Sequence, residues 1–210
     1  MIRCERCWLL LADCLCNQIH TVKTRTRVRL ILHSLEARRS TNTGRIAGLI
    51  LENSSIDYHG RQDAPITDSF QPTPGYLPVL LYPDGAREIS ALANETLPIE
   101  LIVPDGNWNQ AARIGKRIHS LKDLEHVRLP ALQPIHVLRR GGPDRLGTCE
   151  AIFRALGLLE GQEIELELLA QLAMFARSML GERGRRTGRE ASKRNPWKSK
   201  NQSQAKSDLS

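Results

Sequence analysis

LIVPDGNW, residues 101–108, passes from an apolar stretch directly into side chains that suit a binding site. The apolar part is typical of a buried strand, which we expect over residues 99–103. It stops at Pro104 and is followed by a carboxylate, a glycine, an amide and an indole: Asp105, Gly106, Asn107 and Trp108. Asp105 is either a general base or a turn and helix-capping residue. Trp108 either packs in the core or stacks on a nucleobase.

The segments around this stretch alternate between strand-like and helix-like patterns. Apolar runs predict strands, and apolar residues at helical spacing predict helices. The expected strands are 26–34, 77–83, 99–103 and 125–130, and the expected helices are 41–53, 109–118, 148–159 and 163–180. Residues 87–92 are expected to form a helical turn, and 53–76 mostly loop. This alternation predicts an α/β domain with a mainly parallel sheet.

The polar residues that follow these strands indicate where a site would lie. In a parallel sheet a ligand binds outside the carboxyl ends of the strands. Polar segments start at His33, at Tyr82-Pro83 and at Asp105, each just after or at the end of an expected strand. We therefore expect these three segments to meet at the edge of the sheet where the carboxyl ends of the strands lie. We call this edge the rim.

Three further groups have both a structural and a functional interpretation. They are His33 with Glu36, the run Asn42, Thr43 and Gly44 before a helix, and the pair Arg139 and Arg140 in a glycine-rich loop. The first is a structural pair or part of a site. The second caps its helix or holds an anion. The third is a solvated loop or binds phosphate or carboxylate.

Four of the five cysteines fall within 13 residues: Cys4, Cys7, Cys14 and Cys16. Two close pairs of thiolates match a tetrahedral zinc site, although disulfides, redox use or coincidence are alternatives. Four cysteine ligands leave zinc no open position, so such a site favours a scaffold or RNA contact over catalysis. Cys149 stands apart and is expected to be a packing residue.

The charge is concentrated in the last 30 residues. The chain has 210 residues and a net charge of +7, and residues 181–210 hold nine lysines or arginines against three acidic residues. This tail is almost without aliphatic residues, so we expect it to be disordered. It either attracts phosphates or merely increases solubility. No apolar run is long enough for a membrane span, and the start lacks a secretory signal, so we expect a cytoplasmic protein.

Taken in order, the motifs resemble those of the DTW-domain family, the tRNA-uridine aminocarboxypropyltransferases. The resemblance covers residues 4 to about 180. It rests on the cysteine head, LHSLE at 32–36, TNTGR at 41–45, LLYP at 80–83, DGNW at 105–108 with QAAR after it, LRR at 138–140 and TCEAI at 148–152. The individual motifs are weak, whereas the ordered set is specific.

The resemblance implies a fold and a reaction. The fold is SPOUT-like, with a knotted C-terminal part. The reaction transfers the 3-amino-3-carboxypropyl group of S-adenosylmethionine to N3 of a tRNA uridine and releases methylthioadenosine. The implied organisation is a zinc-binding head at 1–20, a catalytic domain at 21–180 and the basic tail at 181–210. The chain differs from the family pattern at Asn107, where the family has threonine, and at Ser34, where it usually has proline.

Roles for individual residues follow as hypotheses. Asp105 acts as the base or orients the uracil, beside Trp108 and Asn107. A second set would hold the donor: Asn42, Thr43, Gly44, His33, Glu36 and Pro83. A third set would hold the RNA backbone: Arg45, Arg139 and Arg140. The alternatives are a SPOUT-type RNA methyltransferase and a zinc-dependent RNA-binding module. The expected partner is tRNA, no membrane is expected, and the sequence indicates no oligomeric state.

Overall fold

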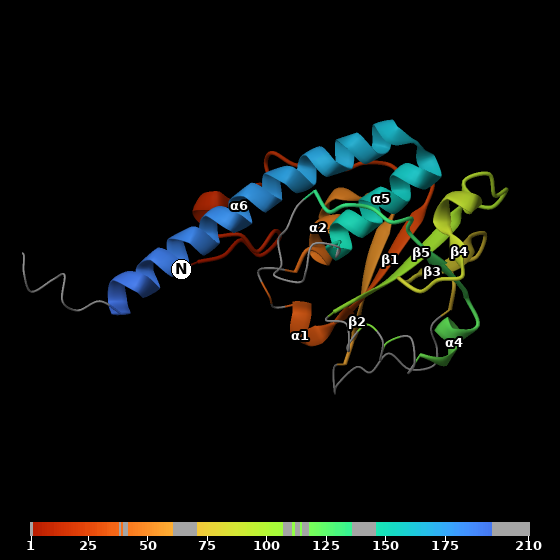
Figure 1. The fold of residues 1–210 in the computed structure, drawn as a ribbon, viewed down its shortest axis with the longest axis horizontal. Coiled ribbons are helices and arrows are strands. Elements are labelled where there is room, and N and C mark those ends of the chain that lie inside the picture. The colour runs from red at the N-terminus through yellow and green to blue at the C-terminus, as the bar shows by residue number, and fades with distance from the viewer. Residues whose placement is uncertain are drawn as a thin grey trace, which may run out of the picture.

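The computed structural model describes residues 2–37, 39, 42–60, 71–106, 111, 114, 118–135 and 146–194 (Figure 1). The strands are β1 (Arg27–His33), β2 (Ser54–His59), β3 (Leu77–Leu81), β4 (Arg87–Glu88), β5 (Ile99–Asp105) and β6 (Glu125–Arg128). The helices are α1 (Ser34–Ala37), α2 (Gly44–Ile50), α4 (His119–Lys122), α5 (Thr148–Glu160) and α6 (Gln162–Arg194), with 3-10 turns η1 (Leu11–Asp13) and η2 (Ile89–Leu92).

The described strands form one six-stranded sheet in the order β2-β1-β5-β3-β6-β4. Every pairing between them is parallel. The expected α/β class is therefore confirmed. All carboxyl ends of the strands lie at one edge of the sheet, and all amino ends lie at the other.

Helices cover both faces of the sheet, with α2, α5 and α6 on one side and α4 on the other (Figure 1). Neighbouring residues of a strand point to opposite faces. Leu30 packs in the larger core cluster with Ile46 of α2 and Phe153 of α5. Ile31, the next residue, packs in a second cluster with Leu121 of α4. Because both faces are buried there, the centres of β1 and β5 read as short apolar runs, Leu30–Leu32 and Leu101–Val103.

Some predicted boundaries were wrong. β2 lies within the segment expected to be loop, and it pairs with β1 from Val28↔Ser54 to His33↔His59. It is an edge strand whose residues are mostly half-exposed, so its sequence SSIDYH carries little apolar signal. The helical turn expected over 87–92 is present as η2, but its first two residues form the short strand β4. The helix expected over 109–118 falls mostly outside the described residues.

Helix α6 is longer than the sequence predicted. It has 33 residues and continues to Arg194, beyond the helix that the sequence predicted over 163–180. A contact that the sequence does not reveal lies just past residue 180. The carboxylate of Glu182 accepts a hydrogen bond from the Leu10 amide at 2.6 Å and pairs with Arg3 at 3.2 Å. Neither α6 nor another helix in the described part combines the length and apolar composition that crossing a bilayer requires.

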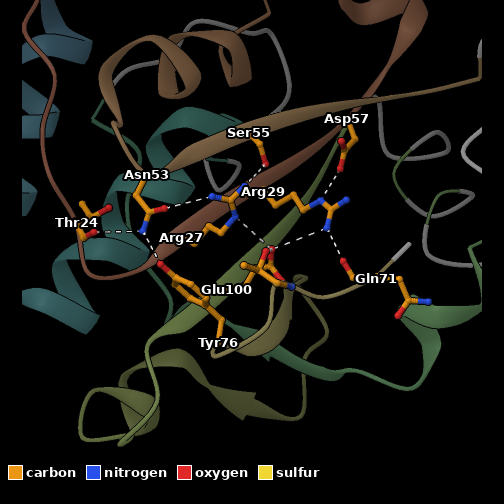
Figure 2. Close-up of polar contacts among 10 residues, drawn as sticks. Thr24, Arg27, Arg29, Asn53, Ser55, Asp57, Gln71, Tyr76 and Glu100 are labelled. Carbon is orange, nitrogen blue, oxygen red and sulfur yellow. Dashed lines mark hydrogen bonds and ion pairs between the residues drawn. The ribbon is translucent and has the colours of Figure 1, made fainter. Parts of the chain in front are cut away.

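A network of charged side chains lies on one face of the sheet near the amino ends of β1 and β5 (Figure 2). At its centre the fully buried Glu100 accepts hydrogen bonds from the amide and hydroxyl of Thr73, at 2.8 and 2.6 Å. Arg27 and Arg29 approach the same carboxylate at 3.5 and 3.9 Å. Arg29 also pairs with Asp57 at 2.5 Å. Arg27 and Arg29, two residues apart in β1, therefore neutralise the buried Glu100, and Arg29 also pairs with the partly exposed Asp57.

Replacing Glu100 with glutamine should lower the free energy of unfolding by about 3 kcal/mol, because two partly buried arginines lose their shared counter-charge. Urea denaturation of the purified protein measures this change. Glu125→Gln is the matched control, since the Glu125–Arg87 pair is about 41% exposed on both sides and should contribute under about 0.5 kcal/mol. Equal, small losses in the two variants would contradict the structural role of Glu100.

Candidate functional site

The candidate site lies where the chain changes direction across the sheet. Strands β1 and β5 are neighbours. The chain leaves β1 toward β2 on one side, and leaves β5 toward β6 on the other. Such a switch point opens a crevice at the carboxyl ends of the two strands, where ligands bind in open parallel sheets. Asp105 is the last residue of β5 and lies opposite Leu32 of β1, so it stands at this point.

The carboxylate of Asp105 connects three segments of the chain. Its side chain is buried, with 1% of the residue exposed. One oxygen accepts a hydrogen bond from the side-chain amide of Asn42 at 2.7 Å. The other accepts a hydrogen bond from the hydroxyl of Thr148 at 2.6 Å. Asp105 therefore ties the starts of α2 and α5 to the end of β5.

The starts of the two helices also approach each other closely. The hydroxyl of Thr43 accepts a hydrogen bond from the Cys149 amide at 3.4 Å. A Cβ atom added to Gly44 would lie 2.3 Å from the Asp105 carboxylate and 2.9 Å from Leu30, so no side chain fits there. The glycine of TNTGR is thus required by the close approach of α2 to Asp105.

Thr148 is a site residue that the sequence interpretation missed. Gly147 is the N-cap residue of α5, and Thr148, the first residue of the helix, turns its hydroxyl to Asp105. The available signal was its place in the TCEAI motif. The N-cap residue of α2 is Thr43, and the side-chain oxygen of the preceding Asn42 accepts a hydrogen bond from the Arg45 amide at 3.1 Å. Cys149 is fully buried, and burial raises the pKa of its thiol well above 9.

The residues expected to hold a donor lie at the rim but differ in access. Asn42, Thr43 and Glu36 are buried, with at most 3% of each residue exposed. Glu36 pairs with Arg39 at 3.1 Å. His33 is partly exposed, and its ring stands edge-on to that of His59 at 6.2 Å. Pro83 is exposed just past the end of β3. His33 and Pro83 are therefore the more accessible members of this set.

Arg45 contacts the protein itself rather than facing open solvent. Its guanidinium donates hydrogen bonds to the carbonyl oxygens of Ala37 and Arg39, at 2.6 and 3.3 Å. It also lies over the ring of Trp8, with 4.6 Å from the guanidinium carbon to the ring centroid. Partial burial lowers the pKa of Arg45. The other residues expected to contact RNA or the uracil, Arg139, Arg140, Asn107 and Trp108, lie outside the described residues.

The four cysteines of the head form one cluster, as the spacing predicted. Their sulfur atoms all lie within 4.8 Å of one another, with 3.7 Å between Cys4 and Cys16 and 3.8 Å between Cys7 and Cys14. A tetrahedral zinc ion with Zn–S bonds of about 2.3 Å sets its sulfurs about 3.8 Å apart. Disulfide sulfurs would be about 2.05 Å apart. The cluster therefore fits one metal ion such as zinc and does not form disulfides.

Hydrogen bonds within the head favour a thiolate at one of these positions. The backbone of Cys7 and Arg6 lowers the pKa of Cys4 to about 6. Burial raises the pKa of Cys16 to about 12. A bound cation would favour the thiolate form of all four, since thiolates are the ligands of zinc.

The family model of the DTW domain matches residues 1–180. The chain belongs to the DTW-domain family. This family is linked to tRNA modification, and the match indicates an enzyme associated with tRNA. The matched range includes the cysteine cluster and all three segments joined by Asp105. No solved structure was found to match the chain.

Thiol titration should separate the four cysteines of the head from Cys149. In the metal-loaded protein we expect little reaction with a disulfide reagent at pH 8. A chelator should release about one zinc ion per chain and expose four reactive thiols. Cys149 should react only on unfolding, because it is fully buried and its raised pKa disfavours the thiolate. Five reactive thiols in the folded, chelated protein would contradict this assignment.

Proposed function

We propose that this DTW-domain protein transfers the 3-amino-3-carboxypropyl group of S-adenosylmethionine to N3 of a tRNA uridine. The observation that carries the proposal is the family match over residues 1–180, combined with the junction of its motifs at Asp105. The junction stands at the switch point of the sheet, where a small-molecule donor would bind. The resemblance further implies a knotted C-terminal part, which stays a proposal because residues 136–145, between β6 and α5, lie outside the described residues.

The reaction needs alignment and the removal of one proton. N3 of uracil attacks the chain carbon next to the donor sulfonium, the carbon–sulfur bond breaks, and its electron pair goes to sulfur. Methylthioadenosine leaves uncharged, so the leaving group needs no acid. N3 lies on the pairing edge of uracil, so the uridine must be unpaired or flipped out. A loop of folded tRNA meets that condition.

The donor is proposed to bind at the rim beside His33 and Pro83. Asn42, Thr43 and Gly44 then form the floor beneath it, because their side chains are buried against Asp105 and the start of α5. The four cysteines would hold zinc as a cross-link of the head. No step of the reaction passes through that metal, since four protein ligands leave it without an open position.

Asp105 is proposed to position this floor rather than to take the proton from uracil. Both of its oxygens already accept a hydrogen bond, and the residue is 1% exposed. A direct base must reach the proton that it removes, within hydrogen-bond distance or through one water. Because the residue is 1% exposed, its carboxylate would have to be uncovered before the proton of uracil could come within that distance.

The reaction is tested by incubating the protein with S-adenosylmethionine and unmodified tRNA, followed by mass spectrometry of nucleosides and by-products. We expect methylthioadenosine together with an aminocarboxypropyl uridine. S-adenosylhomocysteine with a methylated nucleoside would instead assign a methyltransferase. Binding of tRNA without turnover would assign an RNA-binding module. Omitting the donor is the matched blank.

Exchanging the residues at positions 42 and 105 separates positioning from proton transfer. Asp105→Asn alone places an amide group against the amide of Asn42, and should destabilise the fold by about 2 kcal/mol. Adding Asn42→Asp reverses this hydrogen bond and keeps an oxygen for Thr148 and for the Arg45 amide. The double variant should therefore recover most of the unfolding free energy, which urea denaturation measures.

Turnover of the same two variants then decides the role of Asp105. If the residue positions the floor, the double variant should regain at least a tenth of the wild-type rate, while Asp105→Asn stays far below it. If Asp105 is the base, the double variant stays as inactive as the single one, although its stability returns. That second result would contradict the positioning role.

A further inference from the structure

Trp8 has a backbone conformation that a tryptophan rarely adopts. Its φ is +61°, and among the described residues other than glycine it is the only one with a positive φ. The residue directly follows Cys7, in a turn closed by a hydrogen bond from the Trp8 amide to the Cys4 carbonyl at 2.9 Å. Arg3 donates a further hydrogen bond to the Trp8 carbonyl at 2.5 Å. Glycine would adopt this conformation without strain, so the indole needs another reason to be there.

The contact of the indole supplies that reason. It lies against the guanidinium of Arg45, 4.6 Å from ring centroid to the guanidinium carbon, in cation–π geometry. Both side chains are partly buried, so the contact excludes some of the water that would weaken it. A turn between two cysteines of the metal cluster therefore reaches directly to the first turn of α2.

Arg45 connects Trp8 to the rim through hydrogen bonds. Its guanidinium holds the carbonyl oxygens of Ala37 and Arg39, which belong to the segment after β1. Its amide donates to the side-chain oxygen of Asn42. The amide group of Asn42 in turn donates to Asp105. Arg45 thus fixes both sides of the loop that leads into the floor of the candidate site.

The opposite side of the head is fixed to α6. Glu182 accepts hydrogen bonds from Arg3 and from the Leu10 amide, and the His20 amide donates to Gln171 at 3.1 Å. Figure 1 shows the N-terminal segment running beside α6. The head is therefore anchored on α6 and contacts the rim through Trp8.

We propose that the four-cysteine head positions the rim through the stack of Trp8 on Arg45. The turn from Cys4 to Cys7 sets the strained backbone of Trp8, and the indole holds Arg45. Arg45 in turn holds Ala37, Arg39 and the start of α2. The metal that the cysteines would bind is, in this view, remote support for the donor site. The consequence for donor binding rests on the proposed function, whereas the mechanical coupling does not.

The coupling is tested in the full, zinc-loaded chain by amide hydrogen exchange in wild type, Trp8→Gly and Trp8→Phe. Glycine keeps the four cysteines and relieves the positive φ, but it removes the ring. The amides of Arg39, Asn42 and Arg45 should exchange at least tenfold faster in Trp8→Gly. They should remain close to wild type in Trp8→Phe, because phenylalanine keeps an aromatic face for Arg45.

Metal content distinguishes the coupling from a local role of Trp8 in the head. Trp8→Gly should still bind about one zinc ion per chain. Wild-type exchange rates at these amides in the zinc-loaded glycine variant would overturn the proposal. Loss of zinc from that variant would also overturn it, since Trp8 would then support the metal turn and not the rim.

Arg45→Lys shows whether Trp8 acts through Arg45. Lysine keeps the charge but loses the planar fork that holds two carbonyl oxygens while stacking. When Trp8→Gly is added to Arg45→Lys, the exchange rate of the Asn42 amide should change by less than twofold. Full additivity of the two substitutions would overturn the proposed route.

Calorimetry with S-adenosylmethionine provides the functional readout. We expect Kd to rise about tenfold in Trp8→Gly and less than threefold in Trp8→Phe. An unchanged Kd in Trp8→Gly would overturn the effect on donor binding. If the wild type itself binds no S-adenosylmethionine, the proposed function fails, and the exchange rates still decide the coupling.

Discussion

The hydrogen bonds from Asn42 and Thr148 to the buried carboxylate of Asp105 hold together parts of the chain that are 63 and 43 residues apart in sequence. Burying a carboxylate is unfavourable by several kcal/mol unless its oxygens accept hydrogen bonds. The end of β5 can therefore be buried only when the starts of α2 and α5 are both in place. Gly44 is fixed by the same constraint, because any side chain there would collide with Asp105. Three motifs of the sequence thus depend on one another for a physical reason.

Strand β5 carries a buried acid near each end, and the two are built differently. Near the amino end of β5, two arginines balance the charge of Glu100. Thr73 donates a hydrogen bond to the same carboxylate, which fixes the segment before β3. At its carboxyl end Asp105 receives hydrogen bonds from an amide and a hydroxyl, which are neutral donors. The first arrangement stabilises the sheet far from the switch point. The second belongs to the switch point, where the carboxylate orients the side chains of Asn42 and Thr148 at the candidate site.

Most of the fold could be predicted from the sequence, because its central strands are buried on both faces and read as apolar runs. Edge strand β2 could not, since a half-exposed strand with two apolar residues resembles a loop. The cysteine cluster was predictable because tetrahedral coordination imposes a short spacing. Thr148 was missed as a site residue because local sequence favours a cap, and only the tertiary approach of β5 turns the hydroxyl elsewhere. The length of α6 was missed for the same kind of reason, since Arg3 and Leu10 anchor it from the other end of the chain.

Arg45 shows why the head and the rim belong to one unit. Burial lowers the pKa of its guanidinium, while the nearby groups of Tyr58, Cys7 and Asp105 favour the charged form. Cys7 belongs to the metal cluster and Asp105 to the switch point, so the arginine lies in the field of both. A charged, planar side chain between them can stack on Trp8 and at the same time donate to the carbonyl oxygens that precede α2. In the proposed coupling, the four-cysteine cluster influences the candidate site through the position of Arg45 and takes no part in the chemistry.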